Sequence, residues 1–223
     1  MRKLVPVILI FFLISPLFSD EKIIPLSSYP DLNFNQYDPA SLEKMLQNKE
    51  LVFVDDKKGA KEQYVTAGIL IDATPEQVWK VITDFESYPQ FYPQTYKTEI
   101  VAQRGNFYDV KIVLKFKFSI ISTKVKYTLR HWLKEKNHIM VWNILSGDMK
   151  INKGQWTLIP TPDGKKTIAL YSVYADLKTM GGLVKFVLKR EPKLELAMQV
   201  STAILVARST KERVEKLISE HKL

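Results

Sequence analysis

The sequence predicts an α+β fold in which a curved antiparallel sheet wraps around a long C-terminal helix. Between residues 95 and 177, short segments of alternating apolar and polar residues follow one another with turns between them, which is typical of antiparallel strands. Residues 182–223 have helical spacing instead, and one face of that helix carries Leu196, Val200, Ala203, Ala207, Val214 and Leu217. Residues 196–207 contain no charge, yet they are too few to span a bilayer, which takes about 20 apolar residues. The helix must therefore be covered by protein, or by protein together with a bound apolar molecule.

Residues 1–19 predict a secretory signal peptide. Arg2 and Lys3 precede an apolar run that ends at a polar junction. Pro6 and Pro16 interrupt a run that is already short for a membrane span, so we expect cleavage, with an uncleaved anchor as the alternative. The protein is then expected to be exported, to the periplasm if its source is bacterial.

Residues 20–63 form an N-terminal extension that precedes the main domain, residues 64–223. The first half of the extension is rich in proline, serine and asparagine, and we expect it to be extended. A short helix is expected to begin at Pro39, and residues 51–54 are expected to form a brief strand.

The main domain is expected to begin with one strand, residues 64–71, and two short helices. Thr74 is a good N-cap and Pro75 a good first residue for the first helix, and the aromatic, proline-broken stretch 84–93 indicates the second. Alternation and turn signals predict further strands at residues 95–103, 111–118, 125–130, 138–145, 151–159 and 167–177. With the terminal helix starting near Pro192, this order of elements is that of the helix-grip fold.

Three segments in this order resemble a known family. They are residues 71–79 (IDATPEQVW), residues 83–93 (TDFESYPQFYP), and residues 154–158 (GQWTL) followed by an Asp-Gly turn at 163–164. Together they are similar to the START-like (SRPBCC) superfamily, and within it to the polyketide cyclase/dehydrase group that includes coenzyme Q-binding START domains. The resemblance covers residues 64–217. It implies one hydrophobic molecule bound between sheet and terminal helix: some members cyclise polyketides, and others carry lipids, sterols or quinones.

An apolar ligand cavity is the strongest functional interpretation of the alternating strands. Pockets for lipids are lined by apolar and aromatic side chains with a few polar groups that set orientation. The lining residues expected from alternation and from the facing helix are Tyr96, Leu114, Phe116, Tyr127, Leu129, Trp142, Trp156, Tyr171, Val173 and Met198. A fully packed aromatic core would give the same pattern, so the preference for a cavity comes mainly from the family resemblance.

A basic hairpin is expected over residues 111–130. Its lysines alternate outward, beside a mostly apolar tip, and this arrangement suits transient docking on anionic lipid headgroups. The residues expected to contact a membrane are Lys115, Lys117, Ile120, Ile121, Lys124 and Lys126. A solvated strand face, on which the lysines prevent edge pairing, is an equal alternative.

A candidate gate precedes the terminal helix at Met180, Gly181, Gly182 and Leu183. These residues would move to admit a ligand, or they form only a flexible connection.

Composition excludes several classes of chemistry. The chain has no cysteine, so it has no disulfide, thiolate or cysteine-ligated metal. The formal charge of +9 suits nucleic acid or an anionic membrane, but no zinc pattern or RNA-binding signature is present, so we expect no nucleic acid partner. His131, His138 and His221 are not at metal-ligand spacing, and no phosphate loop or nucleophile motif occurs, so we expect no metal and no cofactor.

Three hypotheses for function follow. The leading one is a non-enzymatic binder or carrier of a lipid, quinone or similar hydrophobic molecule. The second is a cyclase or dehydrase in which Tyr127, His131 or Tyr171 positions a proton. The third is an envelope protein-interaction module, in which the extension docks a partner.

Overall fold

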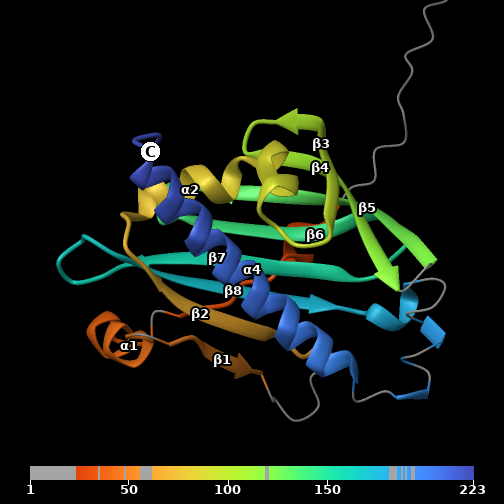
Figure 1. Cartoon of the computed structure of the whole chain (residues 1–223), viewed down its shortest axis with the longest axis horizontal. Coiled ribbons are helices and arrows are strands. Elements are labelled where there is room, and N and C mark those ends of the chain that lie inside the picture. The colour runs from red at the N-terminus through yellow and green to blue at the C-terminus, as the bar shows by residue number, and fades with distance from the viewer. Residues whose placement is uncertain are drawn as a thin grey trace, which may run out of the picture.

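The computed structural model describes residues 24–34, 36–47, 49–55, 62–118, 121–180, 185–186, 188, 190–191 and 194–223. The expected signal peptide lies outside these residues. The fold prediction is confirmed: an eight-stranded antiparallel sheet is crossed on one face by the long helix α4 (Leu194–Ser219), as Figure 1 shows.

The sheet holds its strands in the order β1-β2-β8-β7-β6-β5-β4-β3, and every neighbouring pair is antiparallel. Strands β3 to β8 therefore form a meander, and β2 closes it by pairing with β8. The strands are β1 (Leu51–Val54), β2 (Val65–Ile71), β3 (Thr95–Arg104), β4 (Phe107–Phe118), β5 (Ile121–Lys134), β6 (Ile139–Gly147), β7 (Asn152–Pro160) and β8 (Thr167–Ala175).

Helix α2 (Pro75–Thr83) begins with the capping signal that the sequence contains. The backbone N–H of Thr74 donates to the Gln77 side chain at 3.0 Å, and the Gln77 N–H donates to the Thr74 hydroxyl at 3.4 Å. The helix buries Val78 and Ile82 and packs against α4. The other short elements are α1 (Pro39–Leu46), η1 (Leu26–Ser28), η2 (Phe85–Gln90), η3 (Glu135–Asn137) and η4 (Leu177–Thr179).

The inward face of α4 is narrower and smaller than its apolar spacing predicts. Its buried residues are Gln199, Ala203, Ala207, Ser209, Thr210 and Val214. The spacing placed Leu196 in the buried stripe, but this residue is 38% exposed, and the first buried residue of the helix is Gln199. The alanines let the helix lie close to β2 and β8, with which it is in contact.

The N-terminal extension lies across the convex face of the sheet, opposite α4. Gln155 of β7 bonds the backbone of Leu32 through both its oxygen and its nitrogen, at 3.1 and 2.8 Å, while the neighbouring Trp156 faces α4. Farther along, α1 packs on β2 and β8 through a small apolar cluster, and β1 adds an edge strand to the sheet. The described part of the extension therefore packs against the convex face of the sheet formed by the later residues of the chain.

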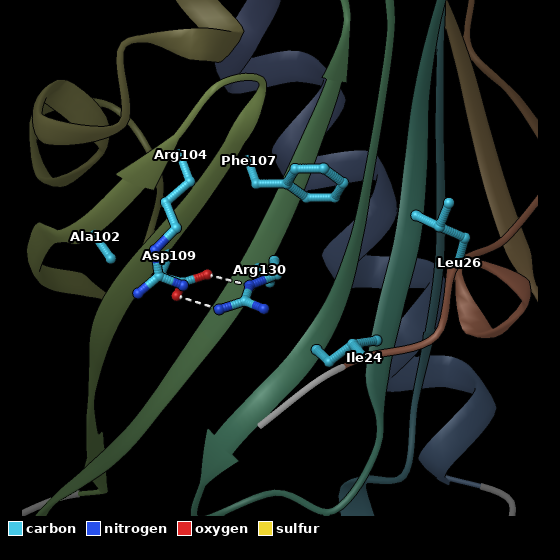
Figure 2. Close-up of a pocket in the computed structure, with 7 residues that line it drawn as sticks. All are labelled: Ile24, Leu26, Ala102, Arg104, Phe107, Asp109 and Arg130. Atoms are coloured by element: carbon cyan, nitrogen blue, oxygen red, sulfur yellow. Dashed lines mark hydrogen bonds and ion pairs between the residues drawn. The ribbon is translucent and has the colours of Figure 1, made fainter. Parts of the chain in front are cut away.

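A hollow of about 230 Å³ separates the start of the extension from β3, β4 and β5 on this face (Figure 2). Ile24 and Leu26 form one side of it. On the other side, Arg130 donates two hydrogen bonds to Asp109, at 2.6 and 2.7 Å. This ion pair is almost fully buried, since the two side chains are only 13% and 9% exposed.

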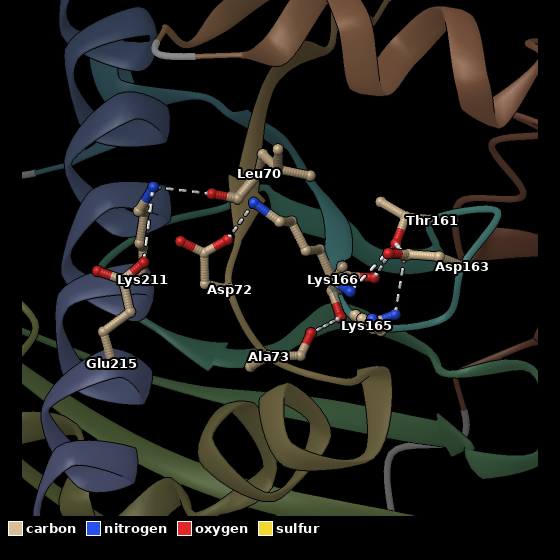
Figure 3. Close-up of polar contacts among 10 residues, drawn as sticks. Leu70, Asp72, Ala73, Thr161, Asp163, Lys165, Lys166, Lys211 and Glu215 are labelled. Atoms are coloured by element: carbon tan, nitrogen blue, oxygen red, sulfur yellow. Dashed lines mark hydrogen bonds and ion pairs between the residues drawn. The ribbon is translucent and has the colours of Figure 1, made fainter.

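A polar contact fixes α4 to the end of β2, as Figure 3 shows. Lys211 of α4 donates to the Leu70 carbonyl oxygen at 2.9 Å. Close by, Lys166 pairs with Asp72 at 2.7 Å, and the Thr167 hydroxyl donates to the Ala73 carbonyl oxygen. The beginning of α4 is held as well, because Glu195 accepts from the Leu177 N–H at 3.1 Å. The helix is therefore held at Glu195 and at Lys211, and the segment between these two contacts covers the cavity.

Candidate ligand-binding site

A cavity of about 200 Å³ lies between the concave face of the sheet and the first half of α4. Every lining residue expected from the sequence borders it except Tyr96; these residues are Leu114, Phe116, Tyr127, Leu129, Trp142, Trp156, Tyr171, Val173 and Met198. Sequence reasoning missed other lining residues, among them Tyr88, Tyr92, Met140, Met149, Thr202 and Val206. The aromatic stretch 84–93 contained a signal for two of them, since several rings so close in sequence need a core to cover them.

Tyr96 does not line the cavity, so its assignment to the site was wrong. The pairing of β3 with β4 shifts register between Thr95 and Lys97, and Tyr96 is left unpaired in between. Such an irregularity turns a side chain away from the face that alternation predicts. Tyr96 is 55% exposed, on the other face of the sheet, where Lys115 and Lys124 lie over its ring.

Stacked rings form the inner wall of the cavity. Trp142 and Tyr171 stack with centroids 5.4 Å apart, and Trp156 meets Tyr171 at 4.9 Å. The Trp142 indole N–H donates to Asn152 at 3.1 Å, which fixes the ring in its plane. Gly154 is directly opposite Trp142 in the sheet, and a Cβ at Gly154 would overlap the Trp142 ring.

The variant Gly154→Ala is therefore expected to destabilise the protein by about 2–3 kcal/mol. The added methyl group meets both the Trp142 ring and the backbone carbonyl oxygen of Ser172, and the backbone cannot move aside easily. Urea denaturation followed by tryptophan fluorescence measures the change. Gly105→Ala is a contrasting variant: no atom lies near its new Cβ, although its positive φ adds some strain. A Gly154→Ala midpoint equal to that of the wild type would contradict this account of the wall.

Two tyrosine hydroxyls are available to a ligand. Tyr88 donates to the Ile82 carbonyl oxygen, and Tyr92 shares a 2.9 Å hydrogen bond with Thr210. The hydroxyls of Tyr127 and Tyr171, in contrast, have no hydrogen-bond partner among the described residues. Burial raises the pKa of both, and the nearby Tyr92 and Tyr127 raise the pKa of Tyr171 further. Both hydroxyls therefore stay protonated at neutral pH and are able to donate to an oxygen atom of a guest.

His131 borders the same cavity and is 3% exposed. Its ring lies 4.6 Å from Phe85 and 6.1 Å from Trp142, measured between centroids, and its Nδ1 atom has no partner in the described part of the chain. Burial lowers its pKa to about 3. The imidazole is therefore neutral at physiological pH.

The candidate gate is described only in part. Met180 is buried and borders the cavity, whereas Gly181, Gly182 and Leu183 lie outside the described residues. The candidate membrane-contact residues divide in the same way. Lys115, Lys124 and Lys126 are described on the outer face of the β4–β5 hairpin, while Ile120 and the side chains of Lys117 and Ile121 are outside the description.

Neither a metal site nor a membrane span is found in the part of the chain that the structure describes. There, no three histidine, aspartate or glutamate side chains are grouped so that they could hold a metal ion. Likewise, none of the described helices combines the length and apolar content needed to cross a membrane.

Comparison with known proteins finds one matching family and several solved structures with a similar fold. The sequence model of the family described as polyketide cyclase / dehydrase and lipid transport matches residues 71–194. No curated protein sequence matches the chain. Three solved structures are similar to it. TTHA0849 from Thermus thermophilus has a TM-score of 0.58 and 20% sequence identity, and the match covers 69% of this chain and 97% of that one. The Zhui aromatase/cyclase from Streptomyces sp. R1128 has a TM-score of 0.58, 16% identity and coverage of 70% and 96%, and a STAR-related lipid transfer protein from Xanthomonas axonopodis has a TM-score of 0.54, 14% identity and coverage of 74% and 93%. At these identities the likeness establishes the fold alone. Because the family model matches more than half of the chain, the protein belongs to the polyketide cyclase / dehydrase and lipid transport family.

Proposed function

We propose that this protein is an exported binder or carrier of a small hydrophobic molecule, which it shields between its sheet and α4. The observation that carries the proposal is the cavity of about 200 Å³ beneath the first half of α4. Apolar side chains and stacked rings line it, with few polar atoms, as in sites that enclose apolar ligands. Export is supported by residues 1–19 of the sequence alone.

The cavity favours a compact guest that carries an oxygen atom. Its volume is below the roughly 300–1,000 Å³ of pockets that hold drug-sized ligands, so a small ring compound fits it better than a long acyl chain. Tyr127 and Tyr171 supply two neighbouring hydroxyl donors in an otherwise apolar wall. A carbonyl or hydroxyl oxygen on the guest would satisfy them and set its orientation.

The protonation states of the side chains that line the cavity favour binding over acid–base catalysis. General acids and bases work best when their pKa is near the working pH. Burial moves the pKa values of Tyr127 and Tyr171 upward and that of His131 down to about 3, so all three are held neutral around pH 7. A cyclase-type activity would have to proceed by positioning the substrate rather than by exchanging protons with these groups.

The packing of the extension favours a binding domain over an interaction module. Asn143 donates to the Ser28 carbonyl oxygen at 3.0 Å, and Gln155 bonds Leu32, so the described part of the extension uses its polar groups on its own sheet. Tyr29 also packs edge-on against Trp132, at 6.2 Å. A docking arm for another protein would need these groups to be available.

Purified mature protein is expected to carry a hydrophobic guest that native mass spectrometry detects and organic solvent extracts. The variant Val173→Phe is expected to lose that guest while remaining folded. Val173 borders the cavity from β8, so a phenyl ring at this position occupies the space of the ligand. Circular dichroism checks the fold, and extraction followed by mass spectrometry measures the bound guest.

The matched control is Val101→Phe, which adds the same ring at a β3 position that is 49% exposed and does not border the cavity. This variant should keep the guest. The carrier proposal fails if no small molecule accompanies the wild type and panels of lipids and quinones also fail to bind. It fails equally if both variants keep the guest at the wild-type level.

A further inference from the structure

We propose that the outer face of the β4–β5 hairpin docks the protein onto bilayers with anionic headgroups. This basic face consists of Lys111, Lys115, Lys124 and Lys126. The inference rests on the proposed function, because a carrier of an apolar guest must exchange it with a phase in which the guest dissolves.

The arrangement of the four lysines costs stability unless an anion meets them. In the β4–β5 register, Lys115 is directly opposite Lys124, and Lys126 is the next residue but one on the same face. Like charges directly opposite each other destabilise an antiparallel pair. None of the four has an ion-pair partner within the described residues.

The nearby carboxylates are engaged elsewhere. Glu99 is opposite Lys111 in the sheet, but its side chain pairs with Lys97 at 2.8 Å. Asp148 accepts a hydrogen bond from the backbone N–H of Lys126 at 2.7 Å. With four lysines and Lys97 against these two acids, the face keeps a net positive charge and complements an anionic surface.

Tyr96 gives the basic face an interfacial residue. Its ring is exposed between Lys124 and Lys115, whose ammonium groups lie 4.5 and 5.3 Å from its centroid. Tyrosine has an apolar body and a polar tip and is enriched where proteins meet the bilayer interface. The register shift that turned Tyr96 away from the cavity is therefore what exposes it beside the lysines.

The basic face is the reverse side of the cavity wall. Leu114 and Phe116 flank Lys115 on β4 and point into the cavity, and Gln94 and Thr95, which also border the cavity, immediately precede Tyr96. Docking through this face therefore brings the border of the cavity close to the headgroups. The apolar guest and the exposed tyrosine favour a lipid surface over nucleic acid or an acidic protein, for which a cavity at this place has no use.

Co-sedimentation with vesicles tests the inference. Mature protein is expected to bind vesicles that contain phosphatidylcholine and phosphatidylglycerol, and not vesicles of phosphatidylcholine alone. Each lysine near an anionic surface increases the partition coefficient of the protein onto the membrane by about five-fold. The triple variant K115Q/K124Q/K126Q is therefore expected to bind roughly 100-fold more weakly at low salt, and added salt should weaken wild-type binding.

The matched control is K80Q/K136Q/K165Q, which has the same formal charge. These exposed lysines lie on α2, on η3 and in the β7–β8 turn, at the ends of the strands away from the hairpin. We expect this control to bind anionic vesicles within a few-fold of the wild type. Equal losses in both triple variants would mean that net charge alone drives binding, and would overturn the docking face.

Guest retention, measured by native mass spectrometry without vesicles, separates the two proposals. If K115Q/K124Q/K126Q keeps the guest but loses vesicle binding, the docking face is supported. If the wild type keeps its guest and binds neither kind of vesicle, docking is overturned while the carrier function stands. If heparin or single-stranded DNA binds the wild type more tightly than anionic vesicles do, the face is a general polyanion site and the inference fails.

Discussion

Replacing Asp109 by Asn is expected to lower the free energy of unfolding by about 3–5 kcal/mol. Asp109 accepts two hydrogen bonds from Arg130, at 2.6 and 2.7 Å, between side chains that are nearly removed from solvent (Figure 2). The neutral amide keeps the shape of the carboxylate but removes the negative charge that the guanidinium of Arg130 faces at these two oxygen atoms. Urea denaturation of the two proteins at pH 7 measures the difference.

Two further variants show whether the buried charge causes that loss. In Glu99→Gln the lost ion pair, with Lys97, is exposed, so we expect a far smaller change. In the double variant Asp109→Leu/Arg130→Met both charges are replaced by apolar groups, and much of the stability should return. The account is wrong if Asp109→Asn is as stable as the wild type, or if the double variant is less stable than the single one.

The core of the fold could be predicted because one face of each strand is buried. In β4 and β5, Ile112, Leu114, Tyr127 and Leu129 alternate with lysines and polar residues, and a register slip of one residue would expose all of them. The helix-grip order followed from the change of period between these strands and α4. The same alternation identified several of the residues that line the cavity from the strands.

The parts that could not be predicted depend on contacts between distant residues. Tyr96 was misplaced because a register shift is set by how β3 pairs with β4, and no local pattern marks it. The fit of Trp142 over Gly154 depends on the β6–β7 register. The first half of the extension was expected to be extended, but where it attaches could not be predicted, because the contact joins Leu32 to Gln155, which is 123 residues away. A sequence period describes one element and contains no information on such pairings.

His131 is expected to make the protein sensitive to acid. Its pKa is about 3 in the folded protein because burial opposes the charged form, whereas an unfolded chain has the ordinary value of 6.5. Between these values the unfolded state binds a proton that the folded state does not, so the free energy of unfolding falls as the pH falls below 6.5. At about 1.4 kcal/mol for each pH unit, the loss is about 2 kcal/mol at pH 5 and about 4 kcal/mol at pH 3.

Comparison with His131→Phe isolates this contribution from that of the carboxylates. The phenyl ring suits a site beside Phe85 and Trp142, and it cannot be protonated. The difference between the two unfolding free energies should be constant above pH 7 and should shift in favour of the variant as the pH falls from 6.5 toward 3. Because His131 borders the cavity, the same acidification should release the guest from the wild type before it does so from the variant. If the two stability curves stay parallel down to pH 4, the folded protein binds the proton as readily as the unfolded chain, and the wall around His131 must admit water despite its burial.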